Sequence, residues 1–236
     1  MLRDGIIEPS TSPWRAQVVV VNNSSHEKRL CIDYSQTINK LTLLDAYLLP
    51  RVHTVANSVA QYKWFSSVDL KSVFHQVPIL PEERLFTTFK ASGQLYQFKR
   101  VPSGLRNAVP CFQRVVNEII SKYNCKGTYA YLDNNTVCGR TREERDENLK
   151  CFLNAAKKCN VTFNEKKSTY ATVSIKLLSY YISNGVLQPD PDRAKSLLEL
   201  PVPNIGKELH RLVGMFAYYA QWAPCFSEKI KPLMAT

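Results

Sequence analysis

Short strand-like runs joined by tight turns, with helical patterns between them, limit most strongly what this sequence can fold into. The clearest turn is Asn184-Gly185, which separates the runs 176–182 and 186–187 and is typical of a two-residue β-hairpin. Three more hairpins are predicted, from the pairs 16–21 with 29–34, 86–90 with 95–101, and 128–134 with 136–138. The elements do not follow the strict strand-helix alternation of a parallel sheet, so we predict an α+β fold with antiparallel sheet.

Helices are predicted in four places. Residues 107–123 repeat apolar side chains three and four positions apart, which is the period of an amphipathic helix. Thr141 with Glu144 forms a capping box at the start of the next helix. Asp190, followed by a proline, predicts a helix that runs to about residue 200, and a last helix is expected over about 205–219.

The charge of the chain indicates an acidic partner. Lys and Arg number 31 against 20 Asp and Glu, a formal net charge of +11. Residues 61–140 carry eleven basic and five acidic side chains, and 141–185 carry eight and five. A strongly basic domain often binds a polyanion such as nucleic acid, and general solubilising charge is the alternative that composition leaves open. No run of four Lys or Arg occurs, which disfavours binding to a membrane surface.

Composition excludes several classes of protein. Hydrophobic residues make up 44% and charged residues 22%, close to the globular average, and no apolar run approaches the roughly 20 residues of a membrane span. The first residues include Asp4 and no apolar signal region, so we expect an intracellular protein of the cytoplasm or nucleus. The seven cysteines contain no C-x-x-C pair, and we expect reduced, packing thiols instead of disulfides or a zinc site.

Two acids each end an apolar run. Asp69 follows residues 64–68, and Asp133 follows residues 129–132. Neighbouring carboxylates repel unless a cation lies between them, and hard oxygen ligands suit Mg²⁺ or Mn²⁺. A pair of such ions stabilises the attacking and leaving oxygens of a phosphoryl transfer. Spacing alone leaves open a simpler interpretation, in which Asp69 caps a helical turn at 71–74 and Asp133 only forms the hairpin turn.

Around these acids the sequence carries a series of motifs. Residues 5–14 read GIIEPSTSPW, and residues 29–34 read RLCIDY. Further along the chain come DAY at 45–47, DLKS at 69–72 with HQ at 75–76, NA at 107–108 with FQR at 112–114, YLD at 131–133, PDP at 189–191, and LVGMF at 212–216 with YY at 218–219. In this order and spacing, over nearly the whole chain, the sequence resembles the reverse transcriptase of gypsy-type (Metaviridae-like) long-terminal-repeat retrotransposons.

The resemblance implies a right-hand polymerase. Its fingers would be residues 1–45 and 81–105, its palm 46–80 and 106–185, and its thumb, with the start of a connection, 186–236. The chain would be the polymerase core of a longer Pol polyprotein, without ribonuclease H, and would reside in a virus-like particle if the element is intact. Its implied activity is RNA-directed DNA polymerase, which extends a primer with dNTPs on an RNA or DNA template; the oligomeric state is not implied.

The resemblance also implies roles for individual residues. Asp69 and Asp133 would hold two Mg²⁺ (or Mn²⁺) ions with the Leu70 carbonyl, and Asn134 would stand at the third catalytic position. Phe74 would block a ribose 2′-hydroxyl and so select deoxynucleotides; the alternative for Phe74 is an aromatic side chain of the core. The full set at the incoming nucleotide would be Arg29, Ser72, Val73, Phe74 and Ser103. The set at the template-primer would be Gly104, Leu105, Tyr131, Leu178, Ser179 and Tyr180.

Several positions depart from the family pattern. Asn134 stands where the family usually has a second Asp, which removes one charge, although a related branch carries Asn there together with a D-Y-S-x-T-I-N form like residues 33–39. Val73 replaces a common Gly, and the basic residues of the fingers tip are absent from 22–27, which leaves Lys28 as the nearest. Further replacements are Ser103 for Phe, Leu48 for Pro and Ser179 for Gly. An impaired remnant that only binds nucleic acid is therefore the alternative function, and a structural protein unrelated to nucleic acid is a third.

Overall fold

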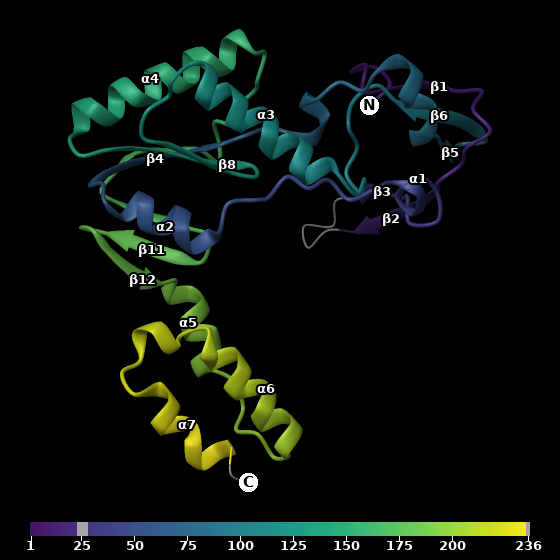
Figure 1. Cartoon of the computed structure of the whole chain (residues 1–236). Helices are drawn as coiled ribbons and strands as arrows, with labels where there is room; N and C mark the ends of the chain where they lie inside the picture. Colours follow the sequence, from purple (N-terminus) through teal and green to yellow (C-terminus); the bar gives the residue numbers. More distant parts are fainter. Residues whose placement is uncertain (23–27, 235–236) are drawn as a thin grey trace.

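The computed structural model describes residues 1–22 and 28–234 of the chain. Figure 1 shows three lobes arranged around a right angle, with the lobe that contains β4 and β8 at the corner. The N-terminal strands form the lobe on the right, and the yellow-green C-terminal helices form the lobe that extends downward. Helices and antiparallel sheets are mixed along the chain, which confirms the predicted α+β class.

The corner lobe is built on a four-stranded antiparallel sheet with the strand order β7-β8-β4-β9. β4 (Trp64–Asp69) pairs with β8 (Asn134–Gly139) along its whole length. β7 (Thr128–Tyr131) pairs with the other side of β8, and β9 (Thr169–Thr172) pairs with β4. The predicted hairpin is confirmed, but its turn lies at residues 132–133, and Asn134 already belongs to β8.

Two helices cover one face of this sheet, α3 (Ala108–Lys122) and α4 (Arg142–Lys158). Successive strand residues point to opposite faces, and Val68 and Val137 pack toward the helices against Ile119 and Phe152. The apolar spacing that predicted α3 therefore reflects the burial of one face of this helix against the sheet.

The start of α4 has the predicted capping box. Thr141 Oγ1 accepts the backbone N–H of Glu144 at 3.2 Å. The Glu144 carboxylate accepts the backbone N–H of Arg140 at 2.7 Å. Two backbone donors at the helix terminus are thereby satisfied.

The opposite face of the sheet packs on α2 (Val52–Ala60) and on a small sheet with the order β10-β11-β12. These three strands are β10 (Ser174–Leu177), β11 (Tyr180–Ser183) and β12 (Val186–Pro189). The turn predicted at Asn184-Gly185 joins β11 to β12. The single strand predicted over 176–182 is wrong, because Leu178 and Ser179 take positive φ values of 51° and 79° and form a turn between β10 and β11.

The N-terminal lobe contains a three-stranded sheet, β1-β6-β5, and a separate hairpin, β2-β3. Its elements are β1 (Ile7–Pro9), β2 (Gln17–Asn22), β3 (Lys28–Asp33), α1 (Ile38–Leu41), the 3₁₀ helix η2 (Pro81–Thr87), β5 (Phe89–Ala91) and β6 (Gln94–Phe98). The hairpins β2-β3 and β5-β6 match the predicted pairs. The predicted strand at 86–90 begins too early, because the chain is still helical through residue 87.

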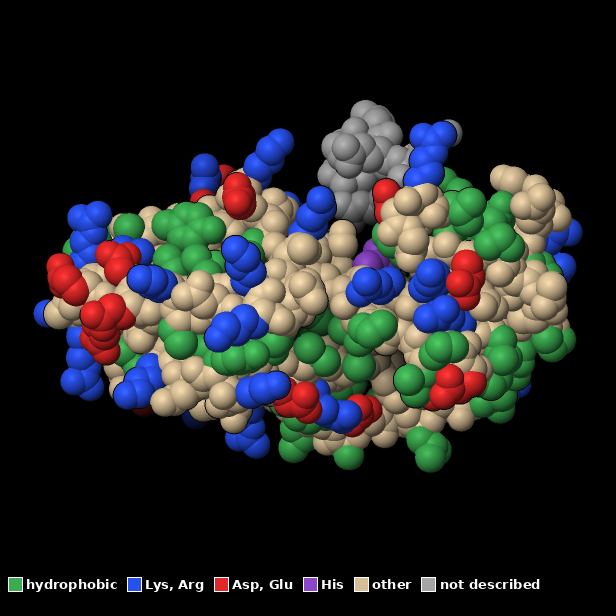
Figure 2. Space-filling view, turned by 90° about the horizontal axis from the view of Figure 1, so that it is seen from above, with side chains coloured by type: hydrophobic (Ala, Val, Ile, Leu, Met, Phe, Trp, Pro, Cys, Tyr) green, Lys and Arg blue, Asp and Glu red, His purple; other side chains and the backbone are tan. Residues whose placement is uncertain are grey.

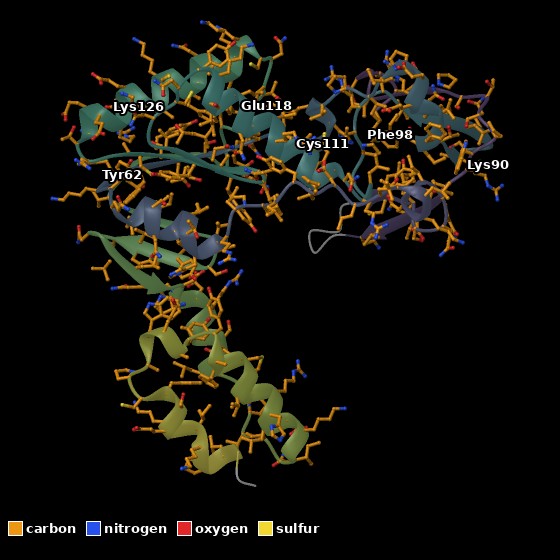
Figure 3. All side chains as sticks on the ribbon, viewed as in Figure 1. Tyr62, Lys90, Phe98, Cys111, Glu118 and Lys126 are labelled. Atoms are coloured by element: carbon orange, nitrogen blue, oxygen red, sulfur yellow. The ribbon has the colours of Figure 1, made fainter. Side chains whose placement is uncertain are left out.

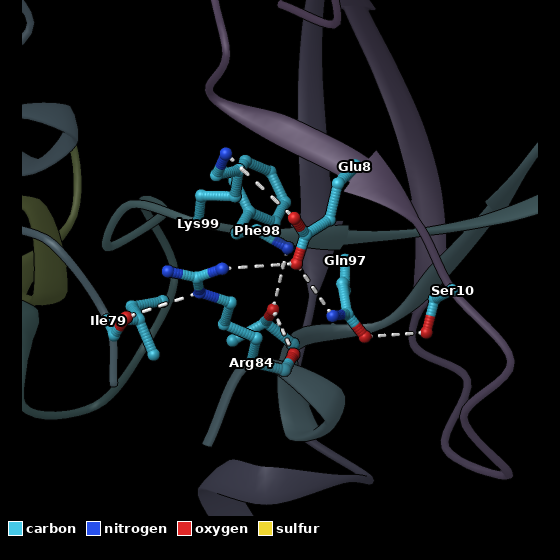
Figure 4. A network of polar contacts seen from close by, with 8 residues as sticks. Glu8, Ser10, Ile79, Arg84, Gln97, Phe98 and Lys99 are labelled. Atoms are coloured by element: carbon cyan, nitrogen blue, oxygen red, sulfur yellow. Dashed lines mark hydrogen bonds and ion pairs between the residues drawn. The ribbon is translucent and has the colours of Figure 1, made fainter. Parts of the chain in front are cut away.

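Glu8 joins three elements of this lobe (Figure 4). Its carboxylate accepts hydrogen bonds from Gln97 Nε2 at 2.9 Å and from Arg84 at 3.3 Å, and Lys99 lies 3.9 Å away. The hydrogen bond from Gln97, with the charges of Arg84 and Lys99, lowers the pKa of Glu8. Gln97 in turn accepts a hydrogen bond from the Ser10 hydroxyl at 2.7 Å. The network thus ties β1 to β6 and η2.

The C-terminal lobe is helical. It consists of α5 (Pro191–Leu198), α6 (Gly206–Ala217), the 3₁₀ helix η3 (Ala220–Trp222) and α7 (Phe226–Met234). Asp190 caps α5 as predicted, by accepting the backbone N–H of Asp192 at 3.1 Å. The Trp222 indole donates to the Leu187 carbonyl at 3.0 Å and so fixes this lobe to β12. Among the helices of the described residues, none is both long and apolar enough to cross a membrane.

Candidate active site

The structure brings the two strand-end acids together. Asp69 is the last residue of β4, and Asp133 lies in the turn between β7 and β8. Because β4 and β8 are neighbours, the Leu70 amide donates directly to the Asp133 carbonyl at 3.1 Å. Both acids line one open cleft of about 750 Å³.

The surroundings of the two carboxylates leave them open to a ligand. Within the described residues, neither the Asp69 nor the Asp133 carboxylate has a hydrogen bond or an ion pair. The 3₁₀ helix η1 (Val73–Gln76) begins at Ser72 without a side-chain cap, so Asp69 does not cap that turn. Over residues 1–22 and 28–234, no group of three His, Cys, Asp or Glu side chains gathers at one point. Two carboxylates in one open cleft that Leu70 also lines fit a hard cation that takes its remaining ligands from phosphate and water.

Residues 162–168, which come later in the chain, bind both the backbone amide and the backbone carbonyl of Asp69. The Asp69 amide donates to Ser168 Oγ at 3.1 Å, and its carbonyl accepts the Asn164 amide at 2.8 Å. The Lys71 amide donates to the Thr162 carbonyl at 3.1 Å. Residues 162–168 therefore fix the strand end from which the acid projects.

A buried glutamine on α3 holds the turn that carries Asp133. Gln113 has no exposed surface, and its Oε1 accepts the Leu132 amide at 2.8 Å, while its Nε2 donates to the Ala130 carbonyl at 3.0 Å. β7 is an edge strand, so Gln113 takes the place of the missing strand on that side. Leu132 has a φ of 54°, a left-handed conformation that costs a non-glycine residue about 1 kcal/mol or more.

Gln113 belongs to the FQR motif at residues 112–114, from which no role for its side chain was predicted. The sequence does mark Gln113 as unusual, because it is a polar residue one position after Phe112, within the apolar pattern of the helix. A buried amide is expected to find partners, although the sequence does not say which.

The cleft collects most of the residues predicted at the nucleotide. Ser72, Val73, Phe74 and Ser103 all line it with Leu70. Phe74 is half-buried, and its ring meets Phe112 edge-on with 6.3 Å between ring centres. Phe74 thus packs on α3 and also forms part of the cleft wall.

Other residues of the cleft were not among those predicted at the site, and they include Lys71, His75, Asn164 and Lys167. Lys71 and Lys167 are exposed and bring positive charge to the cleft that holds the two acids. His75 stacks on Phe98 with 6.2 Å between ring centres, and burial lowers the pKa of His75, which favours the neutral ring at neutral pH.

Asn134 does not line the cleft, but it lies beside the acids. It is the direct partner of Asp69 across β4 and β8 and of Tyr131 across β7 and β8. Directly paired residues project from the same face of a sheet, so Asp69, Asn134 and Tyr131 share one face.

Other predicted contacts lie farther from the acids. The Gly104 carbonyl accepts a hydrogen bond from Asn39 Nδ2 at 2.7 Å, and Leu105 lines a separate, mainly apolar cavity of about 360 Å³. Figure 3 labels Cys111, which also lines this second cavity, at the start of α3 where the lobes meet. The Arg29 backbone pairs with Val21; its side chain and residues 23–27 of the predicted fingers tip lie outside the described part.

The predicted primer contacts belong to the small sheet β10-β11-β12. Leu178 and Ser179 form the β10-β11 turn. Tyr180 is 4% exposed and packs against the rings of Tyr218 and Trp222. The Tyr180 side chain is therefore part of the core, and only the backbone and the preceding turn remain for contact with a ligand.

Basic side chains spread over the surface above α3 and α4. Figure 2 shows Lys and Arg there in larger numbers than Asp and Glu, in a scattered pattern without one continuous stripe. The net charge of +11 is thus not confined to the cleft.

Comparisons with known proteins point to one family. The family model described as "Reverse transcriptase (RNA-dependent DNA polymerase)" matches residues 21–182. The retrovirus-related Pol polyproteins of transposons opus and gypsy from Drosophila melanogaster are 30% and 29% identical to this chain over 99% of its length. The match covers 24% and 23% of those polyproteins, so the chain spans about a quarter of the length of these relatives.

Solved structures share the fold. A foamy viral protease-reverse transcriptase in complex with double-stranded DNA matches with a TM-score of 0.89 and 23% identity, over 99% of this chain and 41% of that one. The same kind of protein in complex with an RNA/DNA hybrid matches with a TM-score of 0.83 and 23% identity, over 99% of this chain and 31% of that one. These matches confirm the predicted polymerase fold.

Proposed function

Because the chain belongs to the reverse transcriptase (RNA-dependent DNA polymerase) family, we propose that it is a polymerase core that extends a primer with dNTPs on an RNA or DNA template. The observation that carries this proposal is the pair of carboxylates, Asp69 and Asp133, which line one cleft without a partner among the described residues. Such a pair suits nucleotidyl transfer, in which charge develops on attacking and leaving oxygens.

The residues present fit Mg²⁺ or Mn²⁺. Asp69 and Asp133 would hold the ions, with the Leu70 carbonyl as a further ligand. When bound, the ions supply positive charge that activates the primer 3′-hydroxyl and stabilises the leaving pyrophosphate. Asn134, on the same face as Asp69, offers a carbonyl oxygen without a charge, so we expect weaker metal binding than with Asp.

The incoming dNTP would occupy the cleft beside Phe74. Lys71 and Lys167 line the cleft and would attract the triphosphate, and Arg29 would clamp it from the fingers. Backbone amides at Ser72 and Val73 would face the phosphates.

Ser103 would lie beside the nucleotide. The half-buried Phe74 ring would exclude a 2′-hydroxyl. The Val73 side chain lines the same cleft and narrows it beside the nucleotide, so we expect slow turnover.

The template-primer would lie across the corner lobe. The relatives of known structure were solved with double-stranded DNA and an RNA/DNA hybrid, and we propose the same class of partner here. Gly104, Leu105 and Tyr131 would lie near the templating end, and the Leu178-Ser179 turn near the primer. Tyr180 would act by supporting this turn from the core. Binding would depend on phosphate contacts, and hence on salt.

We propose the domain bounds that the resemblance to the family implies. The fingers would comprise 1–45 and 81–105, the palm 46–80 and 106–185, and the thumb 186–236. We propose an intracellular location, in the cytoplasm or nucleus, or in a virus-like particle if the element is intact.

Primer extension on poly(rA)/oligo(dT) with Mg²⁺ or Mn²⁺ tests the function. We expect the natural chain to extend the primer, and Asp69→Asn and Asp133→Asn to abolish extension while duplex binding persists. Asp192→Asn is the matched control, because Asp192 is exposed on α5 and lies outside the cleft. Extension by Asp69→Asn at the natural rate would overturn the assignment of the site.

The alternative is an impaired remnant that only binds nucleic acid. Asn134 in place of an acid, together with Val73 in the cleft wall, favours it. In that case the natural chain binds the duplex without extending it, and Asn134→Asp restores extension because the fold is intact. If the natural chain fails to bind template-primer at all, both proposals are wrong.

A further inference from the structure

Two cysteines meet on the side of the corner sheet that α3 and α4 cover. Cys125 follows α3, is 4% exposed and belongs to the core there. Cys151 lies in the middle of α4 and is half-buried. Their sulfur atoms are 3.8 Å apart, which is van der Waals contact. The Cys151 thiol also points to the Tyr123 carbonyl at 3.7 Å.

We propose that Cys125 and Cys151 are an oxidative modification site that closes reversibly to a disulfide. A disulfide bond requires the two sulfur atoms to lie about 2.05 Å apart. Because they are already in contact, a rotation of either side chain can bring them to that distance. The two positions are 26 residues apart in sequence. The segment between them contains the whole β7-β8 hairpin, and with it Asp133 at the turn.

The chemistry is thiol-disulfide exchange with a small disulfide such as oxidised glutathione. Cys151, the more accessible thiol, loses its proton, and its thiolate attacks one glutathione sulfur. A mixed disulfide forms, and one glutathione thiolate leaves. Cys125 then loses its proton and attacks Cys151 Sγ, which expels the second glutathione thiolate. The two released protons neutralise the two leaving thiolates, so two protein thiols are oxidised and one oxidised glutathione is reduced to two thiols.

The surroundings of the two thiols determine which of them reacts first. Burial, with the hydrogen bond from Cys151, raises the pKa of Cys125 to about 12. A thiol so seldom ionised is a poor first nucleophile, but it is already in contact with the sulfur it has to attack. Cys125 is therefore the resolving thiol and Cys151 the attacking one.

Other cysteines lack this arrangement. Cys159 is exposed and contacts the Tyr123 hydroxyl at 4.0 Å, and within the described residues its sulfur meets no other thiol. Cys138 is fully buried on the opposite face of the sheet, among the residues that pack on α2. Cys159→Ser is consequently a control close to the pair in space.

Closure of the pair would restrict the unfolded chain around the hairpin. A loop of this length predicts a rise in Tm of roughly 5–15 °C on oxidation. The rise disappears on reduction with dithiothreitol.

The test oxidises the full chain with oxidised glutathione and removes the excess. We expect an intact mass about 2 Da lower, a peptide that links Cys125 to Cys151, and the higher Tm. Cys151→Ser loses all three, and Cys159→Ser keeps them. Cys125→Ala gives a second test, and if it does not fold, Cys151→Ser, at a half-buried position, still decides. The proposal fails if both thiols stay free to alkylate after oxidation, if Cys151 keeps a stable glutathione adduct, or if the link joins other cysteines. None of these readouts depends on polymerase activity.

Discussion

Replacement of Gln113 by leucine is predicted to loosen the turn that carries Asp133. The side chain is fully buried and makes hydrogen bonds of 2.8 Å to the Leu132 amide and 3.0 Å to the Ala130 carbonyl. Leucine has a similar size, so the substitution removes these bonds without opening a large cavity. The Ala130 carbonyl lies on the edge strand β7 and the Leu132 amide in the turn that follows it, and within the described residues no second strand pairs with β7.

The magnitude follows mainly from the two backbone groups left without partners. The third group that loses a hydrogen bond from Gln113, Asn117 Oδ1 at 3.1 Å, belongs to a half-buried side chain. Each unsatisfied buried backbone group costs about 1–3 kcal/mol. The Leu132 amide is only half-buried and regains some hydration, so we expect a loss of roughly 3 kcal/mol for the two together. For a chain of this size, that corresponds to a fall in Tm of roughly 6–12 °C.

Urea unfolding followed by tryptophan fluorescence measures this loss, and primer extension measures its effect on the site. Gln36→Leu is the control, since Gln36 lies in an exposed turn, and we expect it to change stability by less than about 0.5 kcal/mol. Gln113→Glu keeps the acceptor for Leu132 but replaces the donor to Ala130 with a buried charge, and should cost at least as much. If Gln113→Leu is as stable as the natural chain, or extends a primer equally fast, Gln113 does not support the turn.

Further predictions concern selectivity, helix capping and pH. Phe74→Ala should lower the preference for dNTP over rNTP at least tenfold in single-nucleotide incorporation, because it removes the ring from the cleft wall; an unchanged ratio contradicts that role. Thr141→Ala should cost about 1 kcal/mol in urea unfolding, because the Glu144 amide loses its cap. The lowered pKa of Glu8 means that its interactions stabilise the fold above about pH 4.5 and that this stability is lost as the pH falls through the lower folded-state pKa. Glu8→Gln should therefore reduce stability at pH 7 and flatten its decline below pH 4.5, and equal slopes for both proteins would refute this.

Elements determined by adjacent residues could be predicted from the sequence. Asn184-Gly185 accepts positive φ at low cost, and Thr141 and Asp190 satisfy nearby backbone amides with their own side chains. The two acids could be singled out because a charged residue at the end of an apolar strand is rare in a core. They meet in one cleft because β4, which ends at Asp69, pairs antiparallel with β8, which begins one residue after Asp133.

Elements held by distant contacts could not be predicted. The turn at Leu178-Ser179 contains neither glycine nor proline, and the Ser179 carbonyl is held there by the Asp190 amide at 3.2 Å. Residues 86–87 have strand-like side chains but continue the 3₁₀ helix that begins at Pro81. The helix α2 carries several polar residues, and its apolar face is buried by the small sheet together with Phe65 of β4 and Cys138 of β8.

The turn at Asp133 shows why the support of a site is harder to predict than the site itself. Leu132 adopts a left-handed backbone that glycine would adopt more easily, so the conformation has to be imposed from outside the hairpin. Gln113 supplies one hydrogen bond to this turn from α3, and the Leu70 amide supplies another from the end of β4. Neither group is unusual within its own segment of the sequence. Each finds its hydrogen-bond partner in the turn only after α3, β4 and β7 have packed together. A carboxylate can therefore be located from its strand alone, whereas the groups that fix its direction follow from tertiary structure.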